Sequence, residues 1–275
     1  MLFFRVVLCT VATGLLVTGM PAAHAGGMVR IGGTGMGLEV TRLLVAAMNE
    51  GGVDVSAHIL PSLGSGGGIE ALLDGVLDLA LSSRPLKSAE IAQGAHDAAC
   101  VRTPFVLASS RATTTGLTRA EVAALFADPG AVWPDGMPLR IVLRSRDDSD
   151  NVTLADNFPG MTAALQAARK RPDVPVAATD QDNAEFAQQI GGSLAALSLL
   201  QLHTERLSLQ PLALDGIQPT VENLRAGTYA PSKTLCLVLP RKPTDDALRI
   251  VAFARSAPGI DLFRTAGAIP VDAHD

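Results

Sequence analysis

A glycine-rich stretch with one serine carries the clearest chemical signal in this chain. Residues Gly64–Gly68 read GSGGG; they follow an apolar run and precede a helix predicted over Ile69–Leu73. Glycines let the backbone turn sharply and approach a ligand closely, and the free amides at a helix N-terminus attract anions. The stretch therefore indicates an oxyanion held at a helix entrance. The simpler alternative is a flexible glycine turn in which Ser65 is an ordinary N-cap.

Two more hydroxyl-bearing side chains follow predicted strands. Thr34 comes after the strand predicted over Met28–Gly33, and Ser83 comes after the one over Leu77–Leu81. In open α/β sheets, ligands bind beyond the carboxyl ends of the strands. Since Thr34, Ser65 and Ser83 all occupy such positions, we expect them to converge on one site.

The elements that must position these side chains alternate between strand and helix. Apolar periodicity predicts strands at 28–33, 53–60, 77–81, 101–109, 139–143, 174–178 and 234–239, and helices at 38–48, 69–73, 88–94, 117–128, 152–157, 161–168, 184–189, 219–226, 247–256 and 261–266. This alternation favours parallel sheets flanked by helices. The strands at 101–109 and 234–239 are expected to cross between two lobes.

Length and composition restrict the class of protein. The chain has 275 residues, which fits one large domain or two ordinary ones, and 48% of them are hydrophobic, enough for a sizeable core. The formal net charge of −5 and the lack of any Lys/Arg block argue against a nucleic-acid partner. Aromatic residues make up only 4%, so stacking platforms for bases or sugars are not expected.

The N-terminus has the pattern of a secretory signal peptide. Arg5 supplies the positive charge, Val6–Val17 form a short apolar region, and Ala23-His24-Ala25 is a small-x-small cleavage site. A membrane anchor is the alternative, but the apolar region is short for a span of about 20 residues. We therefore expect cleavage after Ala25 and a periplasmic or secreted protein.

Two cysteines remain after that cleavage, Cys100 and Cys236, since Cys9 lies within the signal peptide. In an oxidising compartment the two could pair. Both lie in apolar, strand-like runs, so two buried free thiols are an equally good interpretation.

The motifs of common enzymes are incomplete. Gly191–Ala195 fails the last position of G-x-S-x-G, and Leu38 stands where a dinucleotide fingerprint needs its third glycine. The chain has no G-K-[ST] phosphate loop, and its histidines are scattered singly, without the spacing of metal ligands. We therefore expect no catalytic residue, no metal and no cofactor.

Several stretches in a fixed order resemble the PstS-like phosphate-binding proteins of ABC importers, which belong to the type II periplasmic binding proteins. The resemblance covers nearly all of residues 28–270 and rests on 33–37, 64–70, 78–86, 117–133, 144–151, 214–220 with 227–229, and 266–270. It implies a two-lobed α/β fold in which each lobe is a mainly parallel sheet flanked by helices, with the ligand cleft between the lobes. Lobe I would comprise 26–108 and 228–275, and lobe II would comprise 109–227.

The resemblance also implies ligand-binding residues in lobe I. The family's first phosphate loop falls on Thr34, Gly35 and Met36, and its helix entrance falls on Ser65, Gly66 and Gly67. Ser83 takes the position of the family's aspartate, which accepts the proton of the phosphate, so the site loses one acceptor there.

In lobe II, the family's arginine falls on Arg144 or Arg146, and Arg144 is preferred because it directly follows a predicted strand. The family's Ser-Gly-Thr loop falls on Ser149, Asp150 and Asn151. A carboxylate at Asp150 would repel an anion unless it pairs with Arg144 or Arg146. Arg84 is a further candidate ligand that could compensate.

The sequence therefore predicts a non-enzymatic, monomeric binding protein. It would capture phosphate or a related oxyanion and pass it to the membrane subunits of an ABC transporter. Two alternatives remain: the same scaffold could bind a more apolar small molecule, or it could be a sensory or interaction module. Apolar side chains around Ser65 would favour the first alternative, and clustered hydrogen-bond donors would favour the oxyanion.

Overall fold

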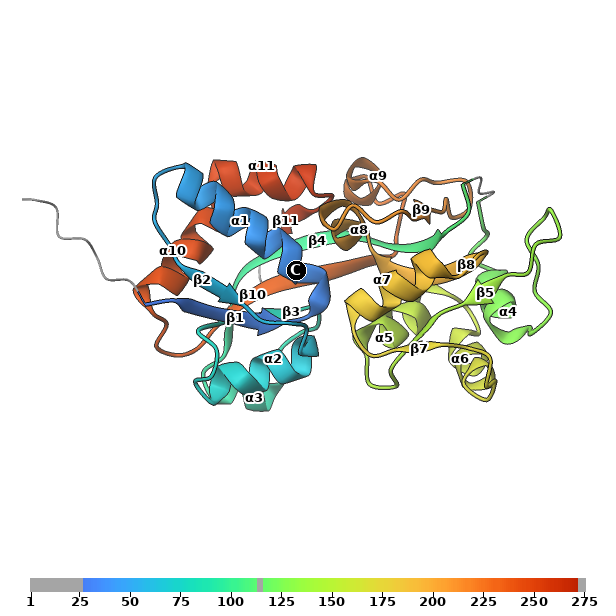
Figure 1. Ribbon diagram of the computed structural model, residues 1–275, viewed down its shortest axis with the longest axis horizontal. Helices are drawn as coiled ribbons and strands as arrows, with labels where there is room; N and C mark the ends of the chain where they lie inside the picture. The colour runs from blue at the N-terminus through green and yellow to red at the C-terminus, as the bar shows by residue number, and fades with distance from the viewer. Residues whose placement is uncertain (1–26, 113–115, 272–275) are drawn as a thin grey trace, which may run out of the picture.

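The structure, a computed structural model, describes residues 27–112 and 116–271. The predicted signal peptide, residues 1–25, lies outside the described residues. The chain folds as a mixed α/β protein in which two long strands, β4 (His96–Ser109) and β10 (Ser232–Leu239), run between two groups of elements (Figure 1).

The first group holds three parallel strands and their helices. Its elements are β1 (Val29–Gly33), η1 (Gly35–Gly37), α1 (Leu38–Glu50), β2 (Ala57–Ile59), α2 (Gly64–Leu73), β3 (Leu79–Ser82) and α3 (Ser88–Ala92), together with the C-terminal α10 (Asp245–Ala254), α11 (Ala257–Thr265) and β11 (Ile269–Val271). Strands β2 and β3 flank β1, and all three are parallel. Their carboxyl ends therefore meet at one edge, as the positions of Thr34 and Ser83 require.

The second group lies at the other end of the crossing strands (Figure 1). Its elements are α4 (Val122–Ala127), β5 (Arg140–Ile141), β6 (Leu143–Arg144), α5 (Ser149–Asn157), α6 (Met161–Ala168), β7 (Val176–Ala177), α7 (Asp180–Gln189), β8 (Ser193–Ser198), α8 (Leu199–Thr204), β9 (Gln210–Pro211) and α9 (Val221–Arg225). Strand β5 is parallel to β8, and β6 is parallel to β7.

One mixed sheet connects the two groups. Its strand order is β2-β1-β3-β10-β4-β8-β5, and β10 runs antiparallel to both β3 and β4. Strand β4 contributes to two separate hydrophobic clusters. Val101 packs in a cluster with Ile31 and Leu235, whereas Phe105 packs in another cluster with Trp133. The predicted α/β class, with helices flanking parallel strands, is confirmed, and the crossing strands add antiparallel pairs to it.

Several predicted helix boundaries were wrong for the same local reason. Helix α5 begins at Ser149 rather than 152, because the Asp148 carboxylate accepts from the Asp150 amide and caps the helix. Helix α7 begins at Asp180 rather than 184, because Thr179 and Asp182 form a capping box. Polar residues that resemble a loop in the sequence are thus the first turns of helices.

Other elements are shorter than predicted or were not predicted. The helix predicted over 117–128 is reduced to α4, and the strand predicted over 139–143 is divided into β5 and β6, which pair with different partners. Strand β2 has three residues, and the C-terminal β11, which pairs with β4, was not predicted. Such short edge elements depend on a tertiary partner more than on local pattern.

Cys100 and Cys236 form a disulfide. The two residues face each other in the antiparallel register of β4 and β10. Of the two interpretations left open by the sequence, the structure therefore contains the paired one. The bond joins the two strands that connect the groups.

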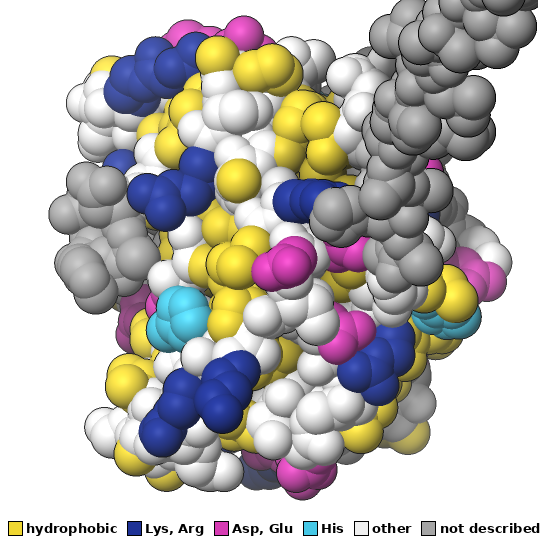
Figure 2. Space-filling model, turned by 90° about the vertical axis from the view of Figure 1, so that its left-hand side faces the viewer, with side chains coloured by type: hydrophobic (Ala, Val, Ile, Leu, Met, Phe, Trp, Pro, Cys, Tyr) yellow, Lys and Arg dark blue, Asp and Glu magenta, His cyan; other side chains and the backbone are white. Residues whose placement is uncertain are grey.

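The charged side chains are spread over the end of the molecule shown in Figure 2. Basic and acidic side chains are scattered over this face among apolar and uncharged ones. Among the helices of residues 27–112 and 116–271, none combines the length and the apolar character that a bilayer crossing needs.

Candidate functional site

A polar cleft of about 370 Å³ lies where the two groups of elements meet. Its walls come from the loop after β1, the start of α2, the loop after β3, the loops after β6 and β7, the start of α5, and β10. The residues that line it are mostly hydroxyl-bearing or charged: Thr34, Ser65, Ser83, Arg84, Lys87, Ser145, Asp147, Asp148, Ser149, Asp180 and Lys233, with Leu63, Gly64, Gly66, Gly67 and Ala178. The cleft therefore lies at the carboxyl ends of strands from both groups.

Three serine hydroxyls form a chain across this cleft. The Oγ atoms of Ser65 and Ser83 are 3.1 Å apart, and those of Ser83 and Ser149 are 3.2 Å apart. The Ser83 amide also donates to Ser65 Oγ at 2.9 Å. Ser65 and Ser83 come from the first group and Ser149 from the second, so a row of hydroxyls joins the two walls.

The glycine run that was interpreted as a turn is the beginning of α2. The helix starts at Gly64, and its N-cap residue, Leu63, makes no side-chain capping hydrogen bond. The simpler alternative, in which Ser65 is an ordinary N-cap, is therefore wrong. Its hydroxyl instead faces Ser83 across the cleft, and the N-terminal end of α2, with its partial positive charge, borders the same space.

Gly68 allows this helix to pack closely on a neighbouring strand. A Cβ atom on Gly68 would lie 2.5 Å from the Cα atom of Gly33 and 3.2 Å from the carbonyl oxygen of Gly32. Helix α2 therefore packs directly on the backbone of β1.

We expect Gly68→Ala to lower the free energy of unfolding by about 1–3 kcal/mol, because backbone on both sides of the contact has to move. Gly66→Ala is the matched control: a Cβ there meets nothing within 4 Å, and alanine favours the helix by about 0.5–1 kcal/mol. Denaturant unfolding of both variants measures the difference. Equal stabilities would contradict the close contact of α2 with β1.

Arg144 lies behind the cleft at the centre of a buried group of charges. Its guanidinium contacts Asp148 at 2.5 Å, Asp180 at 3.4 Å and Asp150 at 3.5 Å, and it donates to the Thr179 carbonyl. Burial alone would lower the pKa of Arg144, but the three carboxylates raise it above its usual value. The arginine therefore stays charged and holds the loops after β6 and β7 together.

A second buried cation completes this group. Lys233, on β10, donates to Ser149 Oγ at 3.1 Å and to the carboxylate of Asp150. Burial opposes its charge, but Asp150, Asp180 and Asp148 raise its pKa. No sequence motif marked Lys233, because its partners are distant in the chain. Asp180 follows β7 and could have been found by the strand-end rule that selected Thr34.

The first loop of the cleft is held by α7. The Thr34 hydroxyl donates to Asp180 at 3.4 Å, and the Gln181 side chain donates to the Gly35 carbonyl at 3.1 Å. These contacts connect residues 146 positions apart. The beginning of α7 thus lies against η1 on one side of the cleft.

The residues selected from the sequence divide into two sets. Seven line the cleft: Thr34, Ser65, Gly66, Gly67, Ser83, Arg84 and Ser149. The other five do not line it: Gly35 and Met36 are buried in η1, Arg144 and Asp150 are buried behind the wall, and Asn151 donates to the carbonyls of Ser145, Arg146 and Asp148. Asp150 pairs with Arg144, as one interpretation of the sequence required, and also with Lys233.

The guanidinium of Arg84 is already engaged at the cleft mouth. It makes two hydrogen bonds to the Glu90 carboxylate, at 2.9 and 2.7 Å. Its charge is therefore balanced within the first group. Lys87, which also lines the cleft, is exposed at the mouth.

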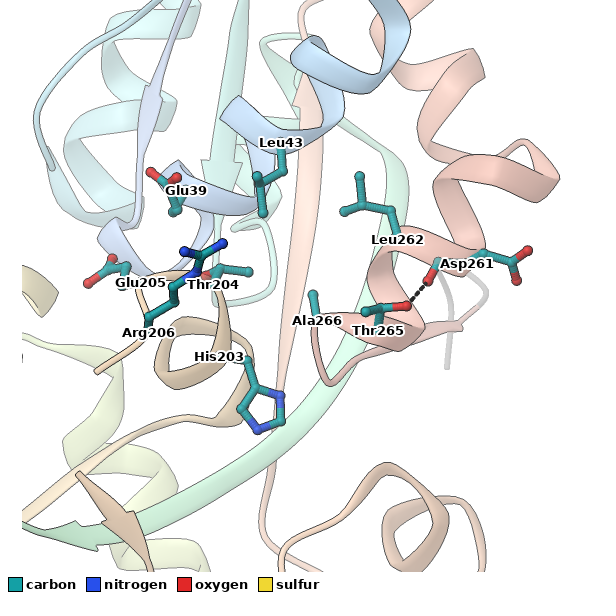
Figure 3. Close-up of a pocket in the computed structure, with 10 residues that line it drawn as sticks. All are labelled: Glu39, Leu43, His203, Thr204, Glu205, Arg206, Asp261, Leu262, Thr265 and Ala266. Atoms are coloured by element: carbon teal, nitrogen blue, oxygen red, sulfur yellow. Dashed lines mark hydrogen bonds between the residues drawn. The ribbon is translucent and has the colours of Figure 1, made fainter. Parts of the chain in front are cut away.

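A larger cavity, of about 920 Å³, lies between α1, the end of α8 and α11 (Figure 3). Its charged lining includes Glu39, Glu205 and Asp261 against the single guanidinium of Arg206. This charge disfavours an anion, and so the smaller cleft is the candidate anion site.

The two cavities share a wall. The Glu205 carboxylate accepts from Gln181 at 2.8 Å and from Gln201 at 3.2 Å. Gln201 also donates to the Asp180 carbonyl at 3.1 Å, and Gln181 donates to the Gly35 carbonyl. Through these hydrogen bonds, Glu205 stabilises the contact of α7 with η1 from the side of the larger cavity.

Comparison with known proteins agrees with this architecture. A family model described as the PBP superfamily domain matches residues 20–262, and the chain belongs to this superfamily. No curated protein sequence matches it.

Solved structures share the fold at low sequence identity. A putative phosphate ABC transporter substrate-binding protein from Clostridium perfringens, with bound phosphate, is 18% identical, with a TM-score of 0.74 over 90% of this chain and 100% of that one. The Azotobacter vinelandii periplasmic molybdate-binding protein is 12% identical, with a TM-score of 0.62 over 89% and 100%. An ABC-type phosphate transport receptor from Vibrio cholerae is 17% identical, with a TM-score of 0.57 over 88% and 99%. The resemblance to PstS-like binding proteins is thus confirmed for the fold.

Proposed function

We propose that this protein is the substrate-binding protein of an ABC importer and that it binds phosphate or a related oxyanion in the cleft. The observation that carries the proposal is the chain of three serine hydroxyls beside Lys233, bordered by the N-termini of α2 and α5. Hydroxyls, helix-terminal amides and a cation are the groups that bind oxyanions in proteins. The protein would bind without catalysing a reaction, and it would act as a monomer.

The lining of the cleft supports an oxyanion over a more apolar ligand. Apart from glycines, only Leu63 and Ala178 are apolar among the lining residues, and clustered donors surround Ser65. Among the solved structures that share the fold, those from Clostridium perfringens and Azotobacter vinelandii are of phosphate- and molybdate-binding proteins. Phosphate and molybdate are both tetrahedral oxyanions.

The carboxylates of the cleft favour an oxyanion that carries a proton. Asp148 and Asp180 line the space, and an ionised carboxylate can only accept hydrogen bonds. Hydrogen phosphate offers a proton to such an acceptor, whereas sulfate does not. We propose that these aspartates take the role that the family's aspartate would have at Ser83.

Two lobes would close on the ligand. Lobe I, residues 26–108 and 228–275, and lobe II, residues 109–227, would move about the crossing strands β4 and β10. The signal peptide would be removed after Ala25, and the mature protein would act in the periplasm, where it would meet the membrane subunits of the transporter.

Calorimetric titration of the protein with phosphate, arsenate, sulfate and molybdate tests this proposal. We expect binding of phosphate and arsenate and weaker binding of sulfate. Ser149→Ala should weaken phosphate binding about fivefold to tenfold, because a charge-assisted hydrogen bond is lost. Thr153→Ala is the control, since this hydroxyl lies one turn further along α5 and donates to the Ser149 carbonyl. An absence of heat with every oxyanion would contradict the proposal.

A further inference from the structure

Lys233 is a buried cation that no sequence motif indicated, and it lies beside the chain of serine hydroxyls. Lys233 is 5% exposed, yet it is among the residues that line the cleft. Its Nζ atom donates to Ser149 Oγ at 3.1 Å, and Ser149 is the last of the three linked hydroxyls. An oxyanion that replaces the contact between Ser83 and Ser149 would therefore lie next to the ammonium.

Asp150 accounts for the presence of this charge in the interior. Its side chain is 2% exposed, and its carboxylate contacts the ammonium of Lys233 and the Nε atom of Arg144, the latter at 3.5 Å. A buried ammonium without a partner would be strongly destabilising. Because Asp150 follows Ser149 directly at the start of α5, the pair also fixes the position of the Ser149 hydroxyl.

The ion pair joins the two groups of elements. Lys233 belongs to the crossing strand β10, and Asp150 belongs to α5 in the second group. Lys233 Nζ also lies 5.9 Å from the centroid of the Phe105 ring on β4. The ammonium is therefore held in place from the strands that connect the groups, in the lining of the cleft.

We propose that Lys233 is a ligand-contacting, specificity-determining cation of the cleft, and that Asp150 is the positioning residue that holds it beside Ser149 and offsets part of its attraction for an anion. The inference rests on the proposed function, and it names the class of ligand as a charged oxyanion, such as hydrogen phosphate, rather than a neutral polar molecule. Lys233 supplies the attraction, and Asp150 sets how much of that attraction the ligand experiences.

Four variants test this assignment: Lys233→Met, Lys233→Arg, Asp150→Asn and the double variant Lys233→Met/Asp150→Asn. Each is titrated with phosphate by calorimetry, and its melting temperature is measured without ligand. We expect Lys233→Met to bind phosphate about tenfold more weakly or worse, with Lys233→Arg recovering part of the loss. Asp150→Asn keeps an oxygen acceptor for Lys233 and removes one negative charge. Because Asp148 and Asp180 still raise the pKa of Lys233 in this variant, the ammonium stays charged and phosphate should bind more tightly.

The double variant separates binding from folding. It has no unpaired charge at this position, so its melting temperature should recover relative to Lys233→Met, while its affinity for phosphate stays low. Recovery of wild-type affinity in the double variant would overturn the assignment of Lys233, and weaker binding by Asp150→Asn would overturn the role of Asp150. A wild-type protein that binds none of phosphate, arsenate and sulfate would instead overturn the proposed function together with this assignment.

Discussion

An Arg144→Ala variant is expected to lose about 3–5 kcal/mol of unfolding free energy and most of its affinity for anions. Arg144 is 4% exposed and contacts the carboxylates of Asp148, Asp150 and Asp180. Removal of the guanidinium would leave these three carboxylates with Lys233 as their one remaining buried cation. Their negative charge would then repel an incoming oxyanion as well as one another.

Arg146→Ala is the matched control for this variant. Arg146 is exposed and lies two residues along the chain, so its replacement should change stability by less than about 0.5 kcal/mol. Denaturant unfolding and phosphate titration of both variants provide the measurement. Similar losses in the two variants would contradict the central place of Arg144 in the buried group of charges.

The second large effect that we expect is the loss of stability on removal of the disulfide. The bond between Cys100 and Cys236 closes a loop with a sequence separation of 136 residues. Cross-links of this kind stabilise folded proteins mainly by restricting the unfolded chain, and removal of a native one costs about 2–5 kcal/mol. We therefore expect Cys100→Ser/Cys236→Ser to unfold at a lower denaturant concentration than the wild-type protein.

The reductant supplies the control for this experiment. Dithiothreitol should shift the unfolding midpoint of the wild-type protein toward that of the serine variant and leave the variant unchanged. A thiol assay on a chain that starts at Gly26, denatured without reductant, should find no free cysteine. Two free thiols in that assay would show that the cysteines are not paired.

Much of the fold could be predicted because it follows from local patterns. Helix α6 has the predicted bounds of Met161–Ala168, and α1 extends the predicted helix by only two residues. The boundaries that failed, at the starts of α2, α5 and α7, lie where glycines, aspartates or threonine begin a helix. These residue types are frequent both in loops and at caps, so the sequence pattern alone did not separate the two.

The residues of the cleft were predicted only in part. Thr34, Ser65 and Ser83 line it as the strand-end rule indicated, and Ser149 lines it as the resemblance implied. Lys233, Asp148 and Asp180 were not proposed as ligand-binding residues. Lys233 lies just before the strand predicted at 234–239, where a lysine is ordinarily solvated. It differs from that expectation because α5 packs against it.

The sequence by itself determined the α/β class and the hydroxyl groups at the ends of the first strands, because periodicity and turn chemistry act over a few residues. The tertiary structure decided whether the two cysteines pair, which charges are buried together, and which hydroxyls meet. Lys233 and Ser149 are 84 positions apart, and Thr34 and Asp180 are 146 apart. Contacts over such separations depend on how the crossing strands bring the two groups of elements together, and no local pattern records that arrangement.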